Sequence, residues 1–416
     1  MFNLSKIIDF ARVSDDEYLS NMGLKKMSKD DSNFIIKYDK DLINSDNINT
    51  IGLFRSVVVQ KKEDTYKVVA FAPPKSVNIK SDEIRSGLVD GKVIFQEFIE
   101  GTMINVYYDT IADGWELATR SIIGGKSRFF KQEDGSTFRQ MFLEAMNEPG
   151  QELEFDDMDK AYSYSFVLQH PKNRIVLKSD KPKIYLCAIY KCVDNIVYEK
   201  DIYCLQEDMK GKVSVPIKYN YDTCDKAKTI LANKLSTPFY CLGVVLKHEN
   251  GIRSKMRNPN YEYVRHLRGN QPKLQFQYLN LRHGGKVKDY LRYYPEATDE
   301  FTKFRNQIHD FTSTLHNFYL GCFARKEMPL RDYPHEYKNH MYVLHQKYIT
   351  ELIPNGGKVT RQVVIQYINE IEPARLMYCL NYKFREMKKM EASIGIKDIS
   401  GESFIVNIKT DISDNV

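Results

Sequence analysis

The chain has 416 residues, enough for about two or three domains that each bury a core. Hydrophobic residues make up 42% and charged residues 28%, a composition that excludes wholesale disorder. Lys and Arg number 61 against 55 Asp and Glu, for a formal net charge of +6. This total is too weak a bias to indicate a nucleic-acid binder by itself.

The composition also argues against membrane and disulfide-rich classes of protein. No apolar run approaches the roughly 18 to 20 residues of a membrane-spanning helix. The seven cysteines are scattered without close pairs, which favours reduced thiols over a disulfide framework or a paired-cysteine zinc site. We therefore expect no membrane partner, no bound metal and a cytoplasmic location.

The first part of the chain is predicted as one α+β domain. Residues 1–50 are mixed and polar, and we interpret them as helices and loops belonging to that domain. From 51 to 282 short β-prone runs alternate with turn-rich segments, among them SVVVQ, YKVVAFA, KVIFQEFI, TMINVYYD, KIYLCAIYKCV and GVVLK. Strands this closely spaced indicate antiparallel sheets and not a doubly wound parallel sheet.

The pattern changes to a helical period in the last third of the chain. Apolar residues then step by three and four, as on one face of an amphipathic helix: Phe301, Phe304, Ile308, Phe311, Leu315, Phe318 and Cys322. A second stripe follows from Tyr337, and Thr360 is predicted to cap a third helix. We expect an all-α domain over 290–388 and a polar tail over 389–416.

Positive charge is concentrated between Gly251 and Arg292. This segment holds ten Lys or Arg and two acids, a local charge of +8, so the rest of the chain sums to −2. Aromatic residues are interleaved with the cations. Cations that hold phosphates beside aromatics that stack bases are typical of RNA-binding surfaces, although a solvated basic face would have the same composition.

Seven short motifs follow one another in a fixed order. They are GLFRSVVV with Arg55, FAPPKSVNI with Lys75, FQEFIEGTMINVYYD with Glu100 and Gly101, ELATRSIIGG with Arg120, FVLQHPKNRIV from Phe166, CLGVVLK from Cys241, and SKMRNPNY with Lys255 and Arg257. In order and spacing they resemble the nucleotidyltransferase domain of phage-type ATP-dependent RNA ligases. The resemblance spans roughly residues 30 to 385, and HPKNRIV is its most specific part.

The resemblance implies a phosphate-binding pocket followed by a helical domain. In that family an early arginine and a lysine contact the nucleotide phosphate, and a Lys-x-Lys strand completes the pocket. Carried over by position, the nucleotide- or RNA-phosphate-binding residues are Arg55, Lys75, Glu100, Gly101, Arg120, Lys255 and Arg257. Proteins of this type occur in large DNA viruses, so a divergent viral member acting in the host cytoplasm is the expected source.

Three departures from the family pattern affect the chemistry. The family's nucleophilic lysine, which forms a lysyl-AMP adduct, corresponds by spacing to Phe98. Its two carboxylates correspond to Val167 and Leu242. Phenylalanine cannot form a phosphoramidate, and apolar side chains supply no oxygen ligand for magnesium.

The sequence therefore predicts a catalytically inactive, RNA-ligase-like protein without a cofactor. We expect it to bind RNA or a nucleotide-bearing RNA 5′ end, including a cap-like group, with an RNA surface at Arg265, Arg268, Lys273 and Arg282. Two alternatives stay open. One is an active ATP-dependent RNA ligase that uses ATP, magnesium and a relocated lysine, with Lys92 and Lys126 the nearest candidates. The other is a scaffold that binds a protein partner through the helical domain.

Overall fold

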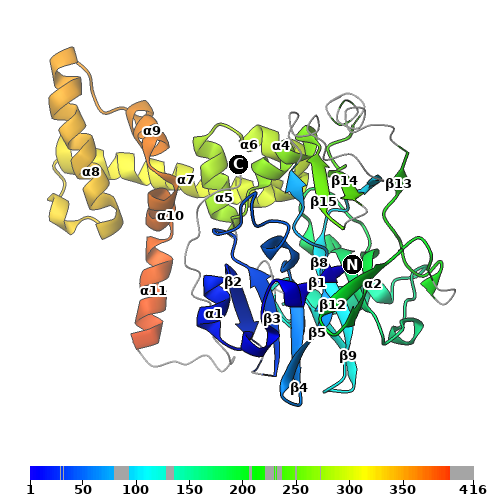
Figure 1. Ribbon diagram of the computed structural model, residues 1–416. Coiled ribbons are helices and arrows are strands. Elements are labelled where there is room, and N and C mark those ends of the chain that lie inside the picture. The colour runs from blue at the N-terminus through cyan, green and yellow to red at the C-terminus, as the bar shows by residue number, and fades with distance from the viewer. Residues whose placement is uncertain are drawn as a thin grey trace. The chain divides into compact units, whose positions relative to one another are not determined.

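The computed structural model describes residues 1–28, 30, 32–78, 93–127, 135–205, 209–220, 229, 231, 237–248, 251–271 and 273–393. The chain divides into two compact units, Met1–Pro272 and Lys273–Val416. In Figure 1 the first runs from blue to green and the second from green to red. Each unit is described by itself.

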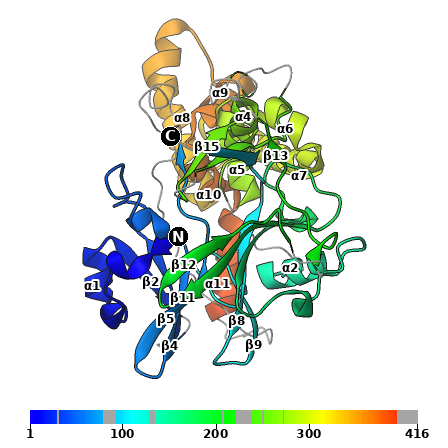
Figure 2. The ribbon, with the colours of Figure 1, turned by 45° about the vertical axis from the view of Figure 1, so that its right-hand side comes forward.

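The largest sheet of the first unit has six strands in antiparallel pairing. Its order is β1–β12–β11–β10–β8–β9. The strands are β1 (Phe2–Asn3), β12 (Ile196–Lys200), β11 (Lys183–Val193), β10 (Ser163–Gln169), β8 (Thr102–Asp109) and β9 (Gly114–Ala118). Figures 1 and 2 show β8 and β9 as adjacent strands of one hairpin.

Two smaller sheets complete the β structure of the described residues. A four-stranded antiparallel sheet, in the order of the chain, contains β2 (Leu24–Ser28), β3 (Asn33–Tyr38), β4 (Val57–Lys62) and β5 (Thr65–Phe71). A five-stranded sheet has the order β13 (Lys218–Tyr219), β7 (Val93–Glu97), β14 (Gly243–His248), β15 (Arg253–Arg257) and β6 (Val77–Asn78). Only its β15–β6 pair is parallel.

Among the described residues, the helices beside these sheets include α1 (Asp16–Asn21), α2 (Phe138–Met146) and α4 (Pro259–Arg268). Helix α2 begins with a capping box of Thr137 and Gln140, which satisfies backbone donors that a helix start leaves open. Its buried side chains pack on one face of the six-stranded sheet, with the Phe142 and Phe166 rings 5.4 Å apart. Figure 2 shows α2 beside that sheet.

The polar first fifty residues differ from their prediction. They were expected to hold helices and loops, but they contain strands β2 and β3. The run Asn33–Tyr38 pairs with β2 and β4 and is almost wholly buried, because Phe34 and Ile36 belong to one apolar core and Ile35 to another. A strand buried on both faces shows no polar and apolar alternation, so its short apolar run carries little periodic signal among polar neighbours.

The second unit is helical in its described residues. Its helices are α5 (Leu274–His283), α6 (Val287–Tyr293), α7 (Thr298–Tyr319), α8 (His335–Lys347), α9 (Arg361–Glu370), α10 (Pro373–Leu380) and α11 (Tyr382–Ser393). The predicted stripe on α7 is buried at Phe301, Ile308, Phe311 and Leu315, and Thr360 caps α9 by accepting from the Val363 N–H. The expected α+β class with antiparallel sheets and a helical C-terminal part is confirmed.

The first and last residues of the helical unit differ from the bounds predicted from the sequence. The unit begins at Lys273, ahead of the 282–290 boundary, because α5 packs on α7 and α10. The Tyr278 and Phe301 rings, for example, lie 5.0 Å apart. At the other end α11 continues to Ser393, past the expected start of the tail, and the rest of 389–416 lies outside the described residues.

A buried histidine links three helices of this unit. Nδ1 of His340 on α8 lies 2.7 Å from the Tyr367 hydroxyl on α9, and Nε2 lies 3.1 Å from the Cys379 Sγ on α10. Burial and the nearby Arg375 charge lower the pKa of His340 to about 4. The imidazole is therefore a neutral packing element at neutral pH.

Candidate functional site

Strand β15 carries a row of three cations. Arg253, Lys255 and Arg257 are half-buried, whereas the intervening Ser254 and Met256 are buried. Alternate residues of a strand point to opposite faces, so the three cations share one face of the sheet. Met256 on the other face belongs to a small apolar core, which fixes the orientation of the row.

Three further cations come from the first half of the unit. Arg55 precedes β4, Lys75 follows β5 and Arg120 follows β9. The Tyr38 ring contacts two of them, with the Lys75 Nζ 5.6 Å and the Arg120 Cζ 4.8 Å from its centroid. Such cation–π contacts hold a cation without neutralising its charge.

The pKa shifts show that these two sets of cations are neighbours. Burial first, and then the charges of Arg257, Lys75 and Arg55, lower the pKa of Lys255 to about 8. Burial and the Arg253 charge lower the pKa of Arg55 to about 10. The structure thus brings together Arg55, Lys75, Arg120, Arg253 and Lys255, which we call the cationic cluster.

The cationic cluster lacks compensating carboxylates. Within the described ranges none of its five members forms an ion pair or donates a hydrogen bond to an acid. The Arg120 Nε is buried with no hydrogen-bond partner. Half-buried, unpaired cations repel one another and lose hydration, so the arrangement favours a bound anion.

Arg257, at one end of the row, is paired. Its Nη1 donates to both carboxylate oxygens of Glu262 at 3.1 Å, and Arg265 lies 3.6 Å from the same carboxylate. Its Nε is nevertheless buried with no partner. Arg257 therefore borders the cationic cluster with one donor still unused.

The three apolar replacements lie on three segments that meet at residues 98–101. The Phe98 N–H donates to the Gly243 carbonyl at 3.1 Å, next to the buried Leu242. A Cβ placed on Gly101 would come within 2.7 Å of the Val167 Cγ1. The segment from Phe98 to Gly101 thus connects Leu242 with Val167, and we call these three side chains the apolar wall.

The described residues contain no group of three or more His, Cys, Asp or Glu side chains that could hold a metal. Glu100, the acid that precedes Gly101, is buried, and its carboxylate accepts hydrogen bonds from the Val176 and Leu177 N–H groups at 3.1 to 3.2 Å. Burial and Glu100 also raise the pKa of the Tyr261 hydroxyl. Glu100 is therefore engaged within the protein.

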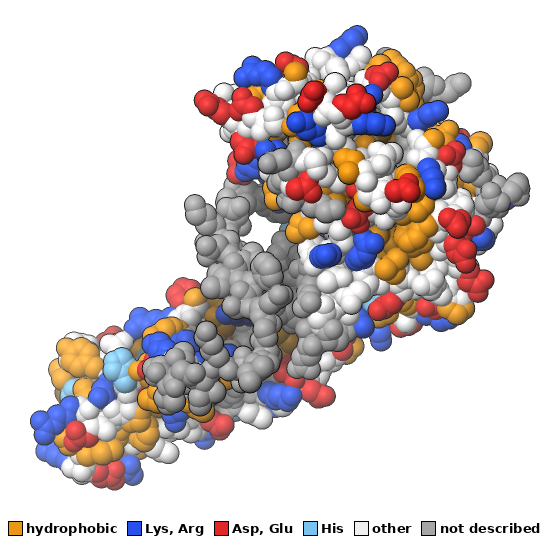
Figure 3. Space-filling model, turned by 90° about the horizontal axis from the view of Figure 1, so that it is seen from below, with side chains coloured by type: hydrophobic (Ala, Val, Ile, Leu, Met, Phe, Trp, Pro, Cys, Tyr) orange, Lys and Arg blue, Asp and Glu red, His pale blue; other side chains and the backbone are white. Residues whose placement is uncertain are grey.

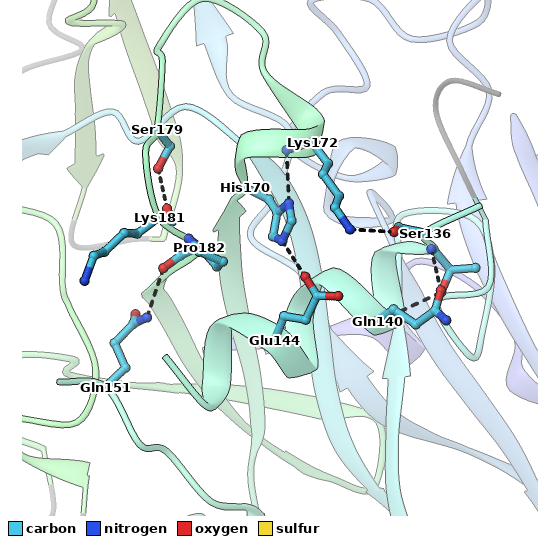
Figure 4. A network of polar contacts seen from close by, with 10 residues as sticks. Ser136, Gln140, Glu144, Gln151, His170, Lys172, Ser179, Lys181 and Pro182 are labelled. Atoms are coloured by element: carbon cyan, nitrogen blue, oxygen red, sulfur yellow. Dashed lines mark hydrogen bonds and ion pairs between the residues drawn. The ribbon is translucent and has the colours of Figure 1, made fainter. Parts of the chain in front are cut away.

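Gly101 and the HPKN segment hold this part of the site together. Gly101 has φ +150°, and a Cβ there would lie 2.3 Å from the Leu168 carbonyl oxygen, so only glycine fits. Figure 4 shows how the HPKN segment is anchored. The His170 Nε2 lies 2.9 Å from Glu144 of α2, and the Lys172 N–H donates to the His170 Nδ1.

The predicted RNA surface is divided between the two units. Arg265 and Arg268 lie on α4 of the first unit, while Lys273 and Arg282 belong to the second. Lys273 is exposed. The Arg282 guanidinium donates to the Asn369 side chain of α9, so it joins two helices of the second unit. The four residues are thus not one surface of a single unit.

One of the two lysines considered as replacement nucleophiles lies among the described residues. Lys126 is exposed in the loop after β9, and Lys92 lies outside the described residues. On the face shown in Figure 3, Lys and Arg side chains are interspersed with Asp and Glu side chains.

Sequence reasoning missed Arg253 and Tyr38. The R-S-K-M-R run of β15 alternates cations with buried residues, and this period of two could have assigned Arg253 to the same face as Lys255. Tyr38 offered no such signal, because its contacts with Lys75 and Arg120 are tertiary. Lys37 was also missed, and burial and the Arg120 charge lower its pKa.

No protein-family model matches the sequence, and no curated protein matches it. Solved structures similar to the chain include an archaeal ATP-dependent RNA ligase, with a TM-score of 0.41, 12% identity, and coverage of 93% of this chain and 83% of that one. A putative ATP-dependent DNA ligase from Aquifex aeolicus has a TM-score of 0.37 and 11% identity, and covers 91% and 79%. An RNA ligase from Naegleria gruberi has a TM-score of 0.32 and 12% identity, and covers 50% and 64%. Likenesses this distant carry no argument about function.

The described helices include none with the length and apolar character needed to cross a membrane.

Proposed function

We propose that the protein binds RNA, or a nucleotide-bearing RNA 5′ end, through the cationic cluster and without forming a covalent nucleotide adduct. The observation that carries this proposal is the set of five half-buried cations with no carboxylate partner in the described residues. Phosphate oxygens are the natural partners of arginine and lysine in such a site. A cap-like group falls within the same ligand class.

The apolar wall supports binding over catalysis. A family nucleophile would stand at Phe98 and family acids at Val167 and Leu242, and none of these side chains can attack a phosphate or ligate a metal. The same replacements remove negative charge that would repel a phosphate. An aromatic and two aliphatic side chains beside cations also offer a surface for a base.

Binding of single-stranded RNA measured against salt concentration tests this proposal. Each phosphate contact contributes a slope of about −0.7 to log K against log salt. The double variant Lys75→Ala/Lys255→Ala should therefore flatten the slope by about 1.4. The control Lys61→Ala/Lys126→Ala removes two exposed lysines and should leave the binding attributed to the cationic cluster in place.

Two results would contradict the proposal. If RNA does not bind, or if the two double variants have the same slope, the cationic cluster is not a phosphate site. A protein-interaction scaffold would then be the better account of the fold.

A further inference from the structure

A cavity adjoins one end of the cationic cluster. Its volume is about 160 Å³, and Lys75 and Arg253 contribute to its lining. Its other walls are mostly apolar and come from segments far apart in the sequence: Phe2, Ile48, Leu53, Pro74 and Ile252. The exposed Asn49 is the one uncharged polar residue of this lining.

The aromatic wall of the cavity is held in place. The Phe2 ring is buried and stacks on Phe71, with centroids 5.5 Å apart and an interplanar angle of 27°. A Cβ built on Gly251 would come within 2.3 Å of the Phe2 ring, so the ring lies directly against the backbone. Packing on two sides fixes Phe2, and the cavity is formed before a ligand arrives.

The size and chemistry of the cavity fit a flat ring joined to a phosphate. An apolar cavity of about 150 Å³ accepts benzene, so this cavity has room for an aromatic ring. The cations in its lining suit a phosphate attached to that ring. The Asn49 amide can donate and accept hydrogen bonds at a ring edge. A nucleobase has this combination of features.

The cavity and the apolar wall lie at opposite ends of the β15 row. Gly243, whose carbonyl accepts from the Phe98 N–H, pairs with Arg257, whereas Arg253 lines the cavity. Four strand residues span roughly 13 Å. The cations of the row therefore have an apolar surface at each end.

We propose that this cavity is a base-binding subsite, and that the ligand carries a nucleoside on each side of the phosphates held by the cationic cluster. The inference rests on the proposed function and extends it from phosphate binding to a ligand with two bases. A dinucleoside polyphosphate and a short RNA strand share this chemistry.

Binding titrations in EDTA with tripolyphosphate, ATP and diadenosine tetraphosphate test the inference. ATP and diadenosine tetraphosphate have the same formal charge but differ in their number of bases. Because stacking contributes about 1–3 kcal/mol per base, diadenosine tetraphosphate should bind at least about fivefold more tightly than ATP. A trinucleotide with a 5′ phosphate, titrated in parallel, distinguishes an RNA strand from a cap-like ligand.

Asn49→Trp fills the cavity from an exposed position of its lining. It should abolish the advantage of diadenosine tetraphosphate over ATP and leave the affinity for tripolyphosphate unchanged. The control Ile111→Trp places the same ring at an exposed position between β8 and β9 and should change none of these affinities. Diadenosine tetraphosphate and the trinucleotide are compared in both variants. The ligand whose affinity falls in Asn49→Trp but not in Ile111→Trp represents the class that binds in the subsite.

The failures are distinguishable. If all the wild-type ligands bind with equal affinity, or if Asn49→Trp weakens neither two-base ligand, the base subsite is wrong and the phosphate site stands. If tripolyphosphate and both nucleotides fail to bind, the cationic cluster itself is wrong as a phosphate site.

Discussion

At the residue scale Lys255 is the most informative member of the cationic cluster. Its pKa is lowered to about 8 by burial and by neighbouring cations, from an ordinary value of 10.5. Between these two pH values the unfolded chain holds a proton that the folded protein has lost. The free energy of unfolding of the ligand-free protein should therefore rise with pH over this interval.

Anion binding should follow the opposite trend. As pH rises through about 8, Lys255 loses its charge, and the affinity for tripolyphosphate should fall by about tenfold between pH 7 and 9, the size of one charge-assisted contact. Lys255→Met should remove both pH effects, measured by denaturant unfolding and by titration. Lys126→Met, at an exposed lysine, is the matched control. Equal pH profiles for the two variants would show that Lys255 is not the titrating group.

The separate members of the cationic cluster could be predicted to different degrees. Motif order alone identifies Arg55, Lys75, Arg120 and Lys255 as candidates, and the structure brings them together. Arg253 could be predicted only from the alternation of cations with buried residues along β15. The pairing of Arg257 with Glu262 depends on the turn from β15 into α4, which no single motif encodes.

At the element scale the start of β8 determines the geometry beside the apolar wall. Gly101 combines φ +150° with a backbone approach that leaves no space for a Cβ. Gly101→Ala should lower the free energy of unfolding by about 3 kcal/mol or more, because both the backbone and the Leu168 carbonyl would have to shift. Denaturant unfolding measures this change.

Gly150 supplies the matched control for this substitution. It also has a positive φ, +90°, but a Cβ there meets nothing within 4 Å. Gly150→Ala should cost only about 1 kcal/mol from the backbone conformation. If both variants lose the same free energy of unfolding, the close approach of β8 to β10 at Gly101 does not exclude a Cβ.

The elements were predictable where the pattern is periodic and less so where it is not. The stripe of α7 and the cap of α9 follow from spacing and from Thr360. Strand β3 does not, because it is buried on both faces among polar neighbours. Most of helix α5 was placed in the first domain by the predicted boundary at 282, but its contacts with α7 and α10 assign it to the helical unit.

At the scale of the whole molecule, a net charge close to zero conceals a local excess of positive charge. The formal charge is +6, yet five cations from β15 and from the ends of three other strands gather in the first unit without acids. The helical unit owes its packing to apolar stripes and to the neutral His340 that joins three helices. We therefore propose that the ligand binds to the first unit.

The central claim is phosphate binding without nucleotidyl transfer, and labelling with α-labelled ATP or GTP in the presence of magnesium tests it most directly. We predict that label is retained by the native protein on a filter and is lost completely on denaturing electrophoresis, since Phe98 cannot form a phosphoramidate. A stoichiometric adduct that survives denaturation and disappears in a single lysine variant, such as Lys255→Met or Lys126→Met, would contradict it.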